Sequence, residues 1–155
     1  MELRRLTTAL GAEVLGLDGT TDLDDATLDA LYAALVEHKV LLLRVPDLTP
    51  EQHMAFGRRI GEIEVHAFFP NLGAGYEHVS VLDSAEGNVA SMWHTDETFL
   101  PAPPLGTLTW AKVMPPFGGD TLWANTEMAY DALSPNMKAY LEGLSAVHDL
   151  ARVTE

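Results

Sequence analysis

The chain has 155 residues, 47% of them hydrophobic and 21% charged, which is typical of one globular domain with a hydrophobic core rather than of a disordered chain. It contains no cysteine, which excludes disulfides, thiolate metal sites and cysteine nucleophiles. A net charge of −14 argues against a nucleic-acid partner, and without a signal peptide or an apolar run of about 18 residues we expect a cytoplasmic protein with no membrane partner.

The first third of the chain predicts strands and helices in alternation. Short apolar stretches broken by glycines in residues 1–20 indicate an opening strand or hairpin. A helix should follow Asp24, because Leu28, Leu31 and Leu35 form one apolar stripe behind an acidic first turn. The apolar run of residues 40–44 then predicts a buried strand.

A second helix has a clear start signal. Thr49 can accept a hydrogen bond as the N-cap, Pro50 suits the first helical position, and Gln52 can complete a capping box. We expect this helix to reach Ile60 and to end at Gly61.

The remainder of the chain has many turn signals and several expected elements. Ser134 and Pro135 form a second cap-and-proline start. The sequence indicates one domain of α+β or β-rich fold, with strands expected at 79–82, 92–98, 106–113 and from 121, and helices at 127–133 and 135–143.

The most informative motif is Trp93-His94-Thr95-Asp96. On an extended segment, side chains two residues apart point to the same side, so His94 and Asp96 can meet at one point. One imidazole and one carboxylate are two thirds of the facial triad of non-haem Fe(II) oxygenases. Taken alone the pair is a weak signal, because a histidine bonded to a nearby aspartate is also a common structural arrangement.

The other histidines give weaker signals, with one exception. His66 lies in an aromatic loop that could line a pocket. Structural roles are the better interpretation for His38, at the end of a predicted helix, and for His148. We expect His53 to be solvent-exposed in the first turn of a helix, and His78 has no obvious partner. No Gly-x-Ser-x-Gly nucleophile elbow is present. The Gly118-Gly119 pair has no phosphate-loop spacing and indicates a tight turn.

Several segments together resemble one enzyme family. The most specific are Trp93-His94-Thr95-Asp96-Glu97-Thr98-Phe99 and Gly118-Gly119-Asp120-Thr121-Leu122-Trp123, in the family's order. Weaker matches lie at 10–18, 38–44, 48–52 and 56–62. The whole of residues 1–155 resembles the TauD/TfdA (taurine-dioxygenase-like) group of Fe(II)- and 2-oxoglutarate-dependent dioxygenases.

This resemblance implies roles for individual residues. His94 and Asp96 would bind Fe(II), and Thr121 would donate its hydroxyl to the distal carboxylate of 2-oxoglutarate. His66 and Phe69 would line the substrate pocket, although taurine-specific members have tyrosine in place of Phe69 and asparagine near Ala90. The implied reaction uses O2 and 2-oxoglutarate to hydroxylate a small substrate, such as a sulfonate or a related acid.

The resemblance also implies a fold, a double-stranded β-helix or jelly roll of the clavaminate-synthase-like kind with flanking helices. In the family, the third iron ligand and a 2-oxoglutarate-binding arginine lie in a C-terminal half, and we do not expect His148 or Arg152 to replace them. We therefore expect a truncated dioxygenase domain with weak iron binding and unpaired strand edges. Its partners would be a small-molecule substrate and either a second copy or a complementing C-terminal fragment.

Two other functions stay open at this point. The chain could be a non-catalytic remnant, or an interaction subunit that needs another chain to complete the site. A metal-dependent hydrolase using His94 and Asp96 is disfavoured, because the sequence has no further His/Asp cluster to build such a site.

Overall fold

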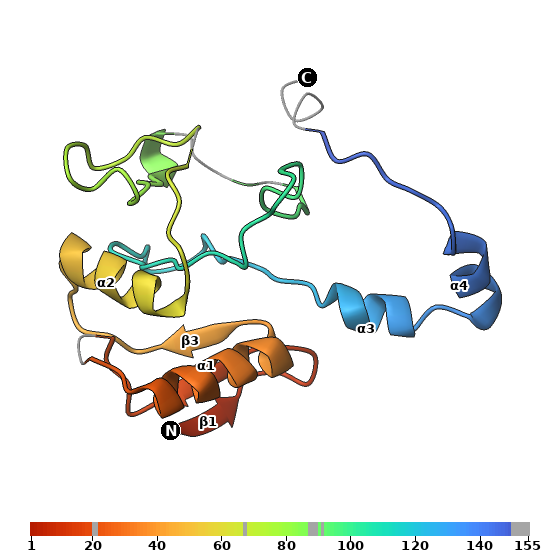
Figure 1. Ribbon diagram of the computed structural model, residues 1–155, viewed down its shortest axis with the longest axis horizontal. Coiled ribbons are helices and arrows are strands. Elements are labelled where there is room, and N and C mark those ends of the chain that lie inside the picture. The colour runs from red at the N-terminus through yellow and green to blue at the C-terminus, as the bar shows by residue number, and fades with distance from the viewer. Residues whose placement is uncertain (20–21, 67, 87–89, 91, 150–155) are drawn as a thin grey trace.

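A computed structural model describes residues 1–19, 22–66, 68–86, 90 and 92–149 (Figure 1). Strands and helices alternate in the first 60 residues, and a long irregular path then leads to two short helices near the C-terminus. The elements are β1 (Glu2–Arg5), β2 (Ala12–Leu15), α1 (Asp25–His38), β3 (Leu41–Leu43), α2 (Pro50–Ile60), a 3-10 turn η1 (Ser84–Glu86), α3 (Thr126–Asp131) and α4 (Pro135–Leu141).

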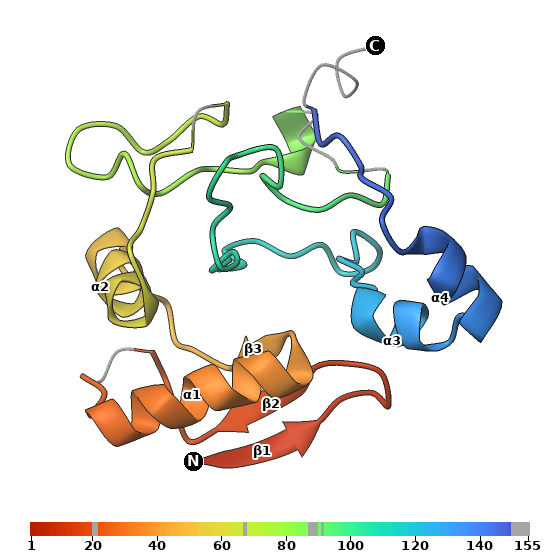
Figure 2. The same cartoon turned by 45° about the vertical axis from the view of Figure 1, so that its right-hand side comes forward.

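A three-stranded sheet forms the base of the molecule, in the order β1-β2-β3. β1 and β2 are the antiparallel hairpin expected from the sequence, and β3 adds to β2 in parallel after the α1 crossover. The α1 helix lies across one face of this sheet (Figure 2). Val14 of β2 packs there with Leu23, Leu31 and Phe56, which joins both long helices to the sheet in one core.

The helix starts predicted from the sequence after Asp24 and at Thr49 are confirmed. The Asp24 carboxylate accepts the backbone N–H of Thr27 at 2.8 Å and so caps α1. At α2, the Thr49 hydroxyl accepts the N–H of Gln52 at 3.3 Å while the Gln52 side chain accepts the N–H of Thr49 at 2.8 Å, forming a complete capping box. These caps satisfy donors that the first helical turn leaves without intrahelical partners.

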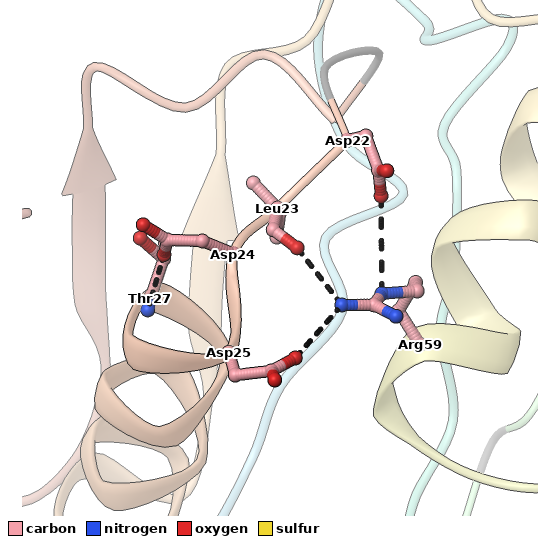
Figure 3. Close-up of polar contacts among 6 residues, drawn as sticks. All are labelled: Asp22, Leu23, Asp24, Asp25, Thr27 and Arg59. Carbon is pink, nitrogen blue, oxygen red and sulfur yellow. Dashed lines mark hydrogen bonds and ion pairs between the residues drawn. The ribbon is translucent and has the colours of Figure 1, made fainter.

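Arg59 ties the end of α2 to the start of α1 (Figure 3). Its guanidinium donates to the Leu23 carbonyl oxygen at 2.9 Å and to the Asp25 carboxylate at 3.3 Å, and lies 3.9 Å from the Asp22 carboxylate. The carbonyl contact is the more informative one, because it fixes the backbone entering α1, whereas the two carboxylates are almost fully exposed. The contacts of Arg59 thus connect α1 and α2, the two helices that share the core.

The outer face of the sheet carries a buried carboxylate. Glu13 on the central strand has a side chain only 5% exposed and is paired with Arg4 on β1 and with Arg44 just after β3. Hydrogen bonding to Arg4 is the main cause that holds the pKa of Glu13 below its usual value, with a further contribution from Arg44. The two arginines compensate the charge that would otherwise make this buried position costly.

The strands expected after residue 60 are not formed within the described residues. Residues 79–82, 92–98, 106–113 and 121–123 have no strand assignment, and the structure shows only an isolated bridge between Asn71 and Ser80. A strand exists only where a second strand completes its ladder, and the described residues supply none here. The α+β class is confirmed, but the jelly roll expected from the resemblance is not formed by this part of the chain.

The two C-terminal helices were predicted within a few residues of their bounds. Ser134 caps α4 by accepting the Met137 N–H at 3.2 Å, with Pro135 next to it, as expected. Asn125 caps α3 and donates to the Ala9 carbonyl oxygen at 2.7 Å, which ties α3 to the hairpin (Figure 2). Neither helix contributes a buried residue to a core, and across the described residues no helix combines the length and apolarity that crossing a membrane demands.

Candidate functional site

His94 and Asp96 face each other, as their spacing of two predicts. The His94 Nε2 atom lies 3.1 Å from the Asp96 Oδ1 atom, and both side chains are more than half exposed. The segment that carries them is irregular from Trp93 to Thr95 and then bends, with Glu97 in the left-handed region at φ 51°. The pair therefore lies at an accessible bend of the chain.

Each of the two side chains is oriented by a further polar contact. The Nδ1 atom of His94 is 2.9 Å from the Met92 carbonyl oxygen, which can only accept, so Nδ1 donates there and Nε2 is the ring nitrogen that faces Asp96. The Thr107 hydroxyl donates to Asp96 Oδ2 at 3.2 Å and leaves Oδ1 on the side of His94. Metal-binding histidines are held in this way, with the second ring nitrogen donating to a carbonyl or carboxylate.

The spacing of the two atoms fits a divalent cation. Ligands held at about 2.1 Å from a metal and at right angles to each other lie about 3 Å apart. The 3.1 Å between His94 Nε2 and Asp96 Oδ1 matches that value. An unprotonated imidazole nitrogen and a carboxylate oxygen are also donors that Fe(II) accepts. The pair thus fits two positions of a facial triad.

A third protein ligand is not found among the residues that the structure describes. No group of three histidine, cysteine, aspartate or glutamate side chains there could hold a metal ion. His148, which was not expected to replace the third ligand, instead bonds through Nδ1 to the Thr98 hydroxyl at 2.7 Å. Arg152, considered for the 2-oxoglutarate carboxylate, lies outside the described residues.

The two expected pocket residues, His66 and Phe69, lie together and next to the His94–Asp96 segment. Their rings stack with centroids 4.4 Å apart. His66 Nδ1 accepts the backbone N–H groups of Phe68 and Phe69, so the proton of the neutral ring is on Nε2. That atom lies 3.5 Å from the Glu97 carboxylate, which directly follows Asp96 in the chain. The aromatic loop is thereby attached to the segment that carries the candidate metal ligands.

Thr121 lies further along the chain, after the turn predicted at Gly118-Gly119. Both glycines have positive φ, 73° and 70°, a conformation that favours glycine at a tight turn. The Thr121 side chain is exposed, and within the described part of the chain no hydrogen bond joins it to His94 or Asp96. Its role toward 2-oxoglutarate therefore stays a prediction.

Two residues of the site were not found from the sequence. Glu97 was quoted only as part of the family motif, and its contact with His66 joins it to a loop 31 residues earlier in the chain. Thr107 is 11 residues after Asp96, in a segment expected to be a strand. No local pattern marks a hydroxyl that reaches a distant carboxylate, so only the three-dimensional structure could identify them.

His53 also differs from its sequence-based interpretation as an exposed residue. It is half-buried on α2 and its Nε2 atom lies 3.1 Å from the Leu108 carbonyl oxygen. Burial is the main cause that lowers the pKa of His53, against an opposing effect of this hydrogen bond. Its ring also meets the edge of Trp110, so His53 attaches the segment around Leu108 to α2.

Comparison with known proteins defines the class to which these features belong. Residues 2–155 match the family described as "Taurine catabolism dioxygenase TauD, TfdA family". The chain belongs to this family, which confirms the resemblance carried by the His94-x-Asp96 and Gly118–Trp123 motifs.

Individual relatives are similar over nearly the whole chain. An alkylsulfatase from Acinetobacter baylyi is 38% identical over 96% of this chain and 47% of its own length. An alpha-ketoglutarate-dependent sulfate ester dioxygenase from Pseudomonas putida is 39% identical over 90% of this chain and 46% of its own. The crystal structure of a taurine dioxygenase from Burkholderia xenovorans matches with a TM-score of 0.72 and 33% identity, over 92% of this chain and 51% of that one. The chain thus spans about half the length of these relatives.

Proposed function

We propose that residues 1–155 form part of a dioxygenase domain that uses Fe(II), O2 and 2-oxoglutarate to hydroxylate a small anionic molecule. The observation that carries this proposal is the oriented pair of His94 Nε2 and Asp96 Oδ1, 3.1 Å apart. Family membership supports the cofactor and the co-substrates. The alkylsulfatase and the sulfate ester dioxygenase among the relatives favour a sulfate ester, a sulfonate or a related acid as substrate.

In this proposal His94 and Asp96 hold the metal, and the Met92 carbonyl and the Thr107 hydroxyl hold the two ligands in place. When bound, the iron would let O2 oxidise 2-oxoglutarate and the substrate together, so that one oxygen atom would enter succinate, the other would become the hydroxyl of the product, and CO2 would leave. The Asp96 carboxylate offsets part of the positive charge of the cation.

The remaining predicted residues would bind and orient the organic molecules. Thr121 would donate its hydroxyl to the distal carboxylate of 2-oxoglutarate. The stacked rings of His66 and Phe69 would form an apolar wall that excludes water from the substrate, because they lie next to the metal-binding segment. The Glu97 contact keeps the His66 ring fixed in that wall.

A specific observation also favours the second candidate function, a subunit that needs another polypeptide to complete its site. The described residues include two candidate metal ligands and no group of three His, Cys, Asp or Glu side chains that could hold a metal ion. Two ligands give weak and poorly selective metal binding, because each missing ligand removes both bonding and preorganisation. The two candidates differ in whether this chain alone turns over substrate.

The test is anaerobic addition of Fe(II) and 2-oxoglutarate to the purified chain, followed by O2. A weak visible charge-transfer band is expected, and His94→Ala or Asp96→Ala should abolish it. His78→Ala is the matched control, because His78 is exposed and is not one of the proposed ligands. A band without succinate formation after O2 favours the subunit, and a band that survives both ligand substitutions refutes the proposed metal site.

A further inference from the structure

The turn that carries Asp96 contains an unfavourable backbone conformation. Glu97, the residue after Asp96, has φ 51°, and in the described part of the chain Lys39 is the one other non-glycine residue with positive φ. This conformation costs free energy, so such a turn persists only where surrounding contacts hold it. A hydrogen bond from the Leu100 N–H to the Glu97 carbonyl oxygen, at 2.9 Å, closes the backbone there. The orientation of Asp96 therefore depends on what fixes residues 95–98.

Two threonine hydroxyls bridge this turn, and a histidine holds one of them. The Thr95 hydroxyl lies 2.7 Å from the Thr98 hydroxyl, so the residues on both sides of Asp96 and Glu97 are joined. The Thr98 hydroxyl also lies 2.7 Å from Nδ1 of His148. Because each hydroxyl donates one hydrogen, the three groups form two consecutive hydrogen bonds that run in one direction or the other. We refer to them as the Thr95–Thr98–His148 network.

His148 reaches this turn from a distant part of the sequence. It lies 50 residues after Thr98, in the segment that leaves α4 and returns towards the turn (Figure 2). His148 is exposed, and α4 before it contributes no buried residue, so the contact does not serve a core. The effect of His148 is therefore confined to the residues that it holds, and these lie beside a candidate metal ligand.

We propose that His148 is a positioning residue for Asp96, acting through Thr98 and Thr95. The imidazole holds Thr98, the two hydroxyls hold the turn, and the turn directs the Asp96 carboxylate towards His94 Nε2, 3.1 Å away. His148 is not itself a metal ligand in this proposal. The inference rests on the proposed function, since it gives His148 a part in the metal site of His94 and Asp96.

Two neutral replacements of His148 separate its hydrogen bond from the charge and bulk of the ring. The amide atoms of asparagine are attached to Cγ, as Nδ1 is in histidine, and they can donate or accept, so His148→Asn keeps a partner for Thr98. His148→Leu keeps an apolar side chain without any polar atom. A difference between the two variants therefore reports the hydrogen bond. His78→Leu is the matched control, because it removes an exposed histidine outside the network.

The first measurement is the Kd of Mn(II) by electron paramagnetic resonance. His148→Leu should weaken binding about threefold to tenfold, the range that the loss of one or two hydrogen bonds produces. His148→Asn and His78→Leu should stay within about twofold of the unsubstituted chain. The midpoint of urea unfolding should be the same in all of them, because His148 is exposed and packs in no core. A merely structural role would lower that midpoint instead.

The second measurement needs no metal. The Leu100 amide, whose hydrogen bond closes the turn, should exchange hydrogen about threefold to tenfold faster in His148→Leu and at nearly the unsubstituted rate in His148→Asn, as measured by NMR. Thr98→Val should have the effect of His148→Leu. Combining these two substitutions should add little to either one, because both interrupt the same network.

The inference would be overturned if His94→Ala abolished Mn(II) binding while His148→Leu left the affinity within about twofold. It would also be overturned if asparagine failed to rescue the loss, or if the effects of Thr98→Val and His148→Leu were additive. Failure of the proposed function has a different signature. Mn(II) binding that survives His94→Ala would refute the metal site itself, and with it any part of His148 in that site.

Discussion

The first 60 residues and the segment beyond residue 90 differ in how their apolar side chains are used. In the first region β2, α1 and α2 enclose Val14, Leu31 and Phe56, each less than 10% exposed. In the second region Trp93, Val113 and Phe117 are more than 70% exposed. The difference teaches that the first region forms a core of its own, whereas among the described residues the region with the candidate ligands leaves its large apolar side chains exposed.

The largest expected effect is on the free energy of unfolding, and it distinguishes a buried aromatic residue from an exposed one. Phe56→Ala should lower the free energy of unfolding by about 3–5 kcal/mol, because it leaves a cavity where α2 meets the sheet. Trp123→Ala should change it by less than about 0.5 kcal/mol, because that ring is 58% exposed. Urea unfolding followed by far-UV circular dichroism measures both. Equal losses would contradict the division into a closed region, the first 60 residues, and an open region beyond residue 90.

The next effect concerns the orientation of Asp96. Thr107→Val keeps the shape of the side chain but removes the hydroxyl that donates to Asp96 Oδ2. We expect the Mn(II) affinity of the chain to fall by about 10–100-fold, as for other residues that orient a metal ligand. Calorimetric titration checks this. Thr109→Val in the same exposed stretch is the control, and a similar loss there would show that the Thr107 contact is not responsible.

Removing the N-cap of a helix should have different effects on stability in the two regions. Thr49→Ala removes the capping box of α2, whose side chains enter the core, and should cost about 1 kcal/mol of stability. Ser134→Ala removes the corresponding cap of α4, which has no buried residue, and should leave the main unfolding transition in place. Thermal unfolding measures both variants. A larger loss at Ser134 would mean that α4 belongs to the closed region.

The smallest effect is a pH dependence at the boundary between the regions. Burial lowers the pKa of His53 in the folded chain, so below about pH 6.5 the unfolded chain binds more protons than the folded one. The contribution of His53 is complete above that pH, and it is lost as the pH falls from about 6.5 toward the lowered folded pKa. Hydrogen exchange around Leu108 should accelerate in that window, and His53→Gln should remove the acceleration. A pH-independent rate in the unsubstituted chain would contradict the assignment.

The sequence predicts the helices of both regions and the strands of the first, but not the structure of the chain between residue 60 and α3, for a physical reason. Helix caps and apolar stripes are local, so Thr49, Ser134 and the α1 stripe could be recognised from neighbouring residues alone. Strands after residue 60 were expected from their apolar runs, but a ladder requires a partner that the described residues do not supply.

In the candidate site, too, contacts between neighbouring residues could be predicted and contacts between distant segments could not. The approach of His94 to Asp96 was predicted from the spacing of two, and the structure places them accordingly. The contacts of Glu97 with His66 and of Thr107 with Asp96 join segments that are distant in sequence, and no periodicity reports such contacts. The roles of Thr121, His66 and Phe69 stay predictions carried by the family resemblance.

The central claim is that His94 and Asp96 form part of a metal site completed by further polypeptide. The most direct test is the Kd of Mn(II), measured by electron paramagnetic resonance for this chain alone and for its complex with the complementing half of a relative. We predict weak binding that His94→Ala abolishes, and an affinity at least about tenfold higher in the complex. The same affinity with and without the second polypeptide, or binding that persists in His94→Ala, would contradict the claim.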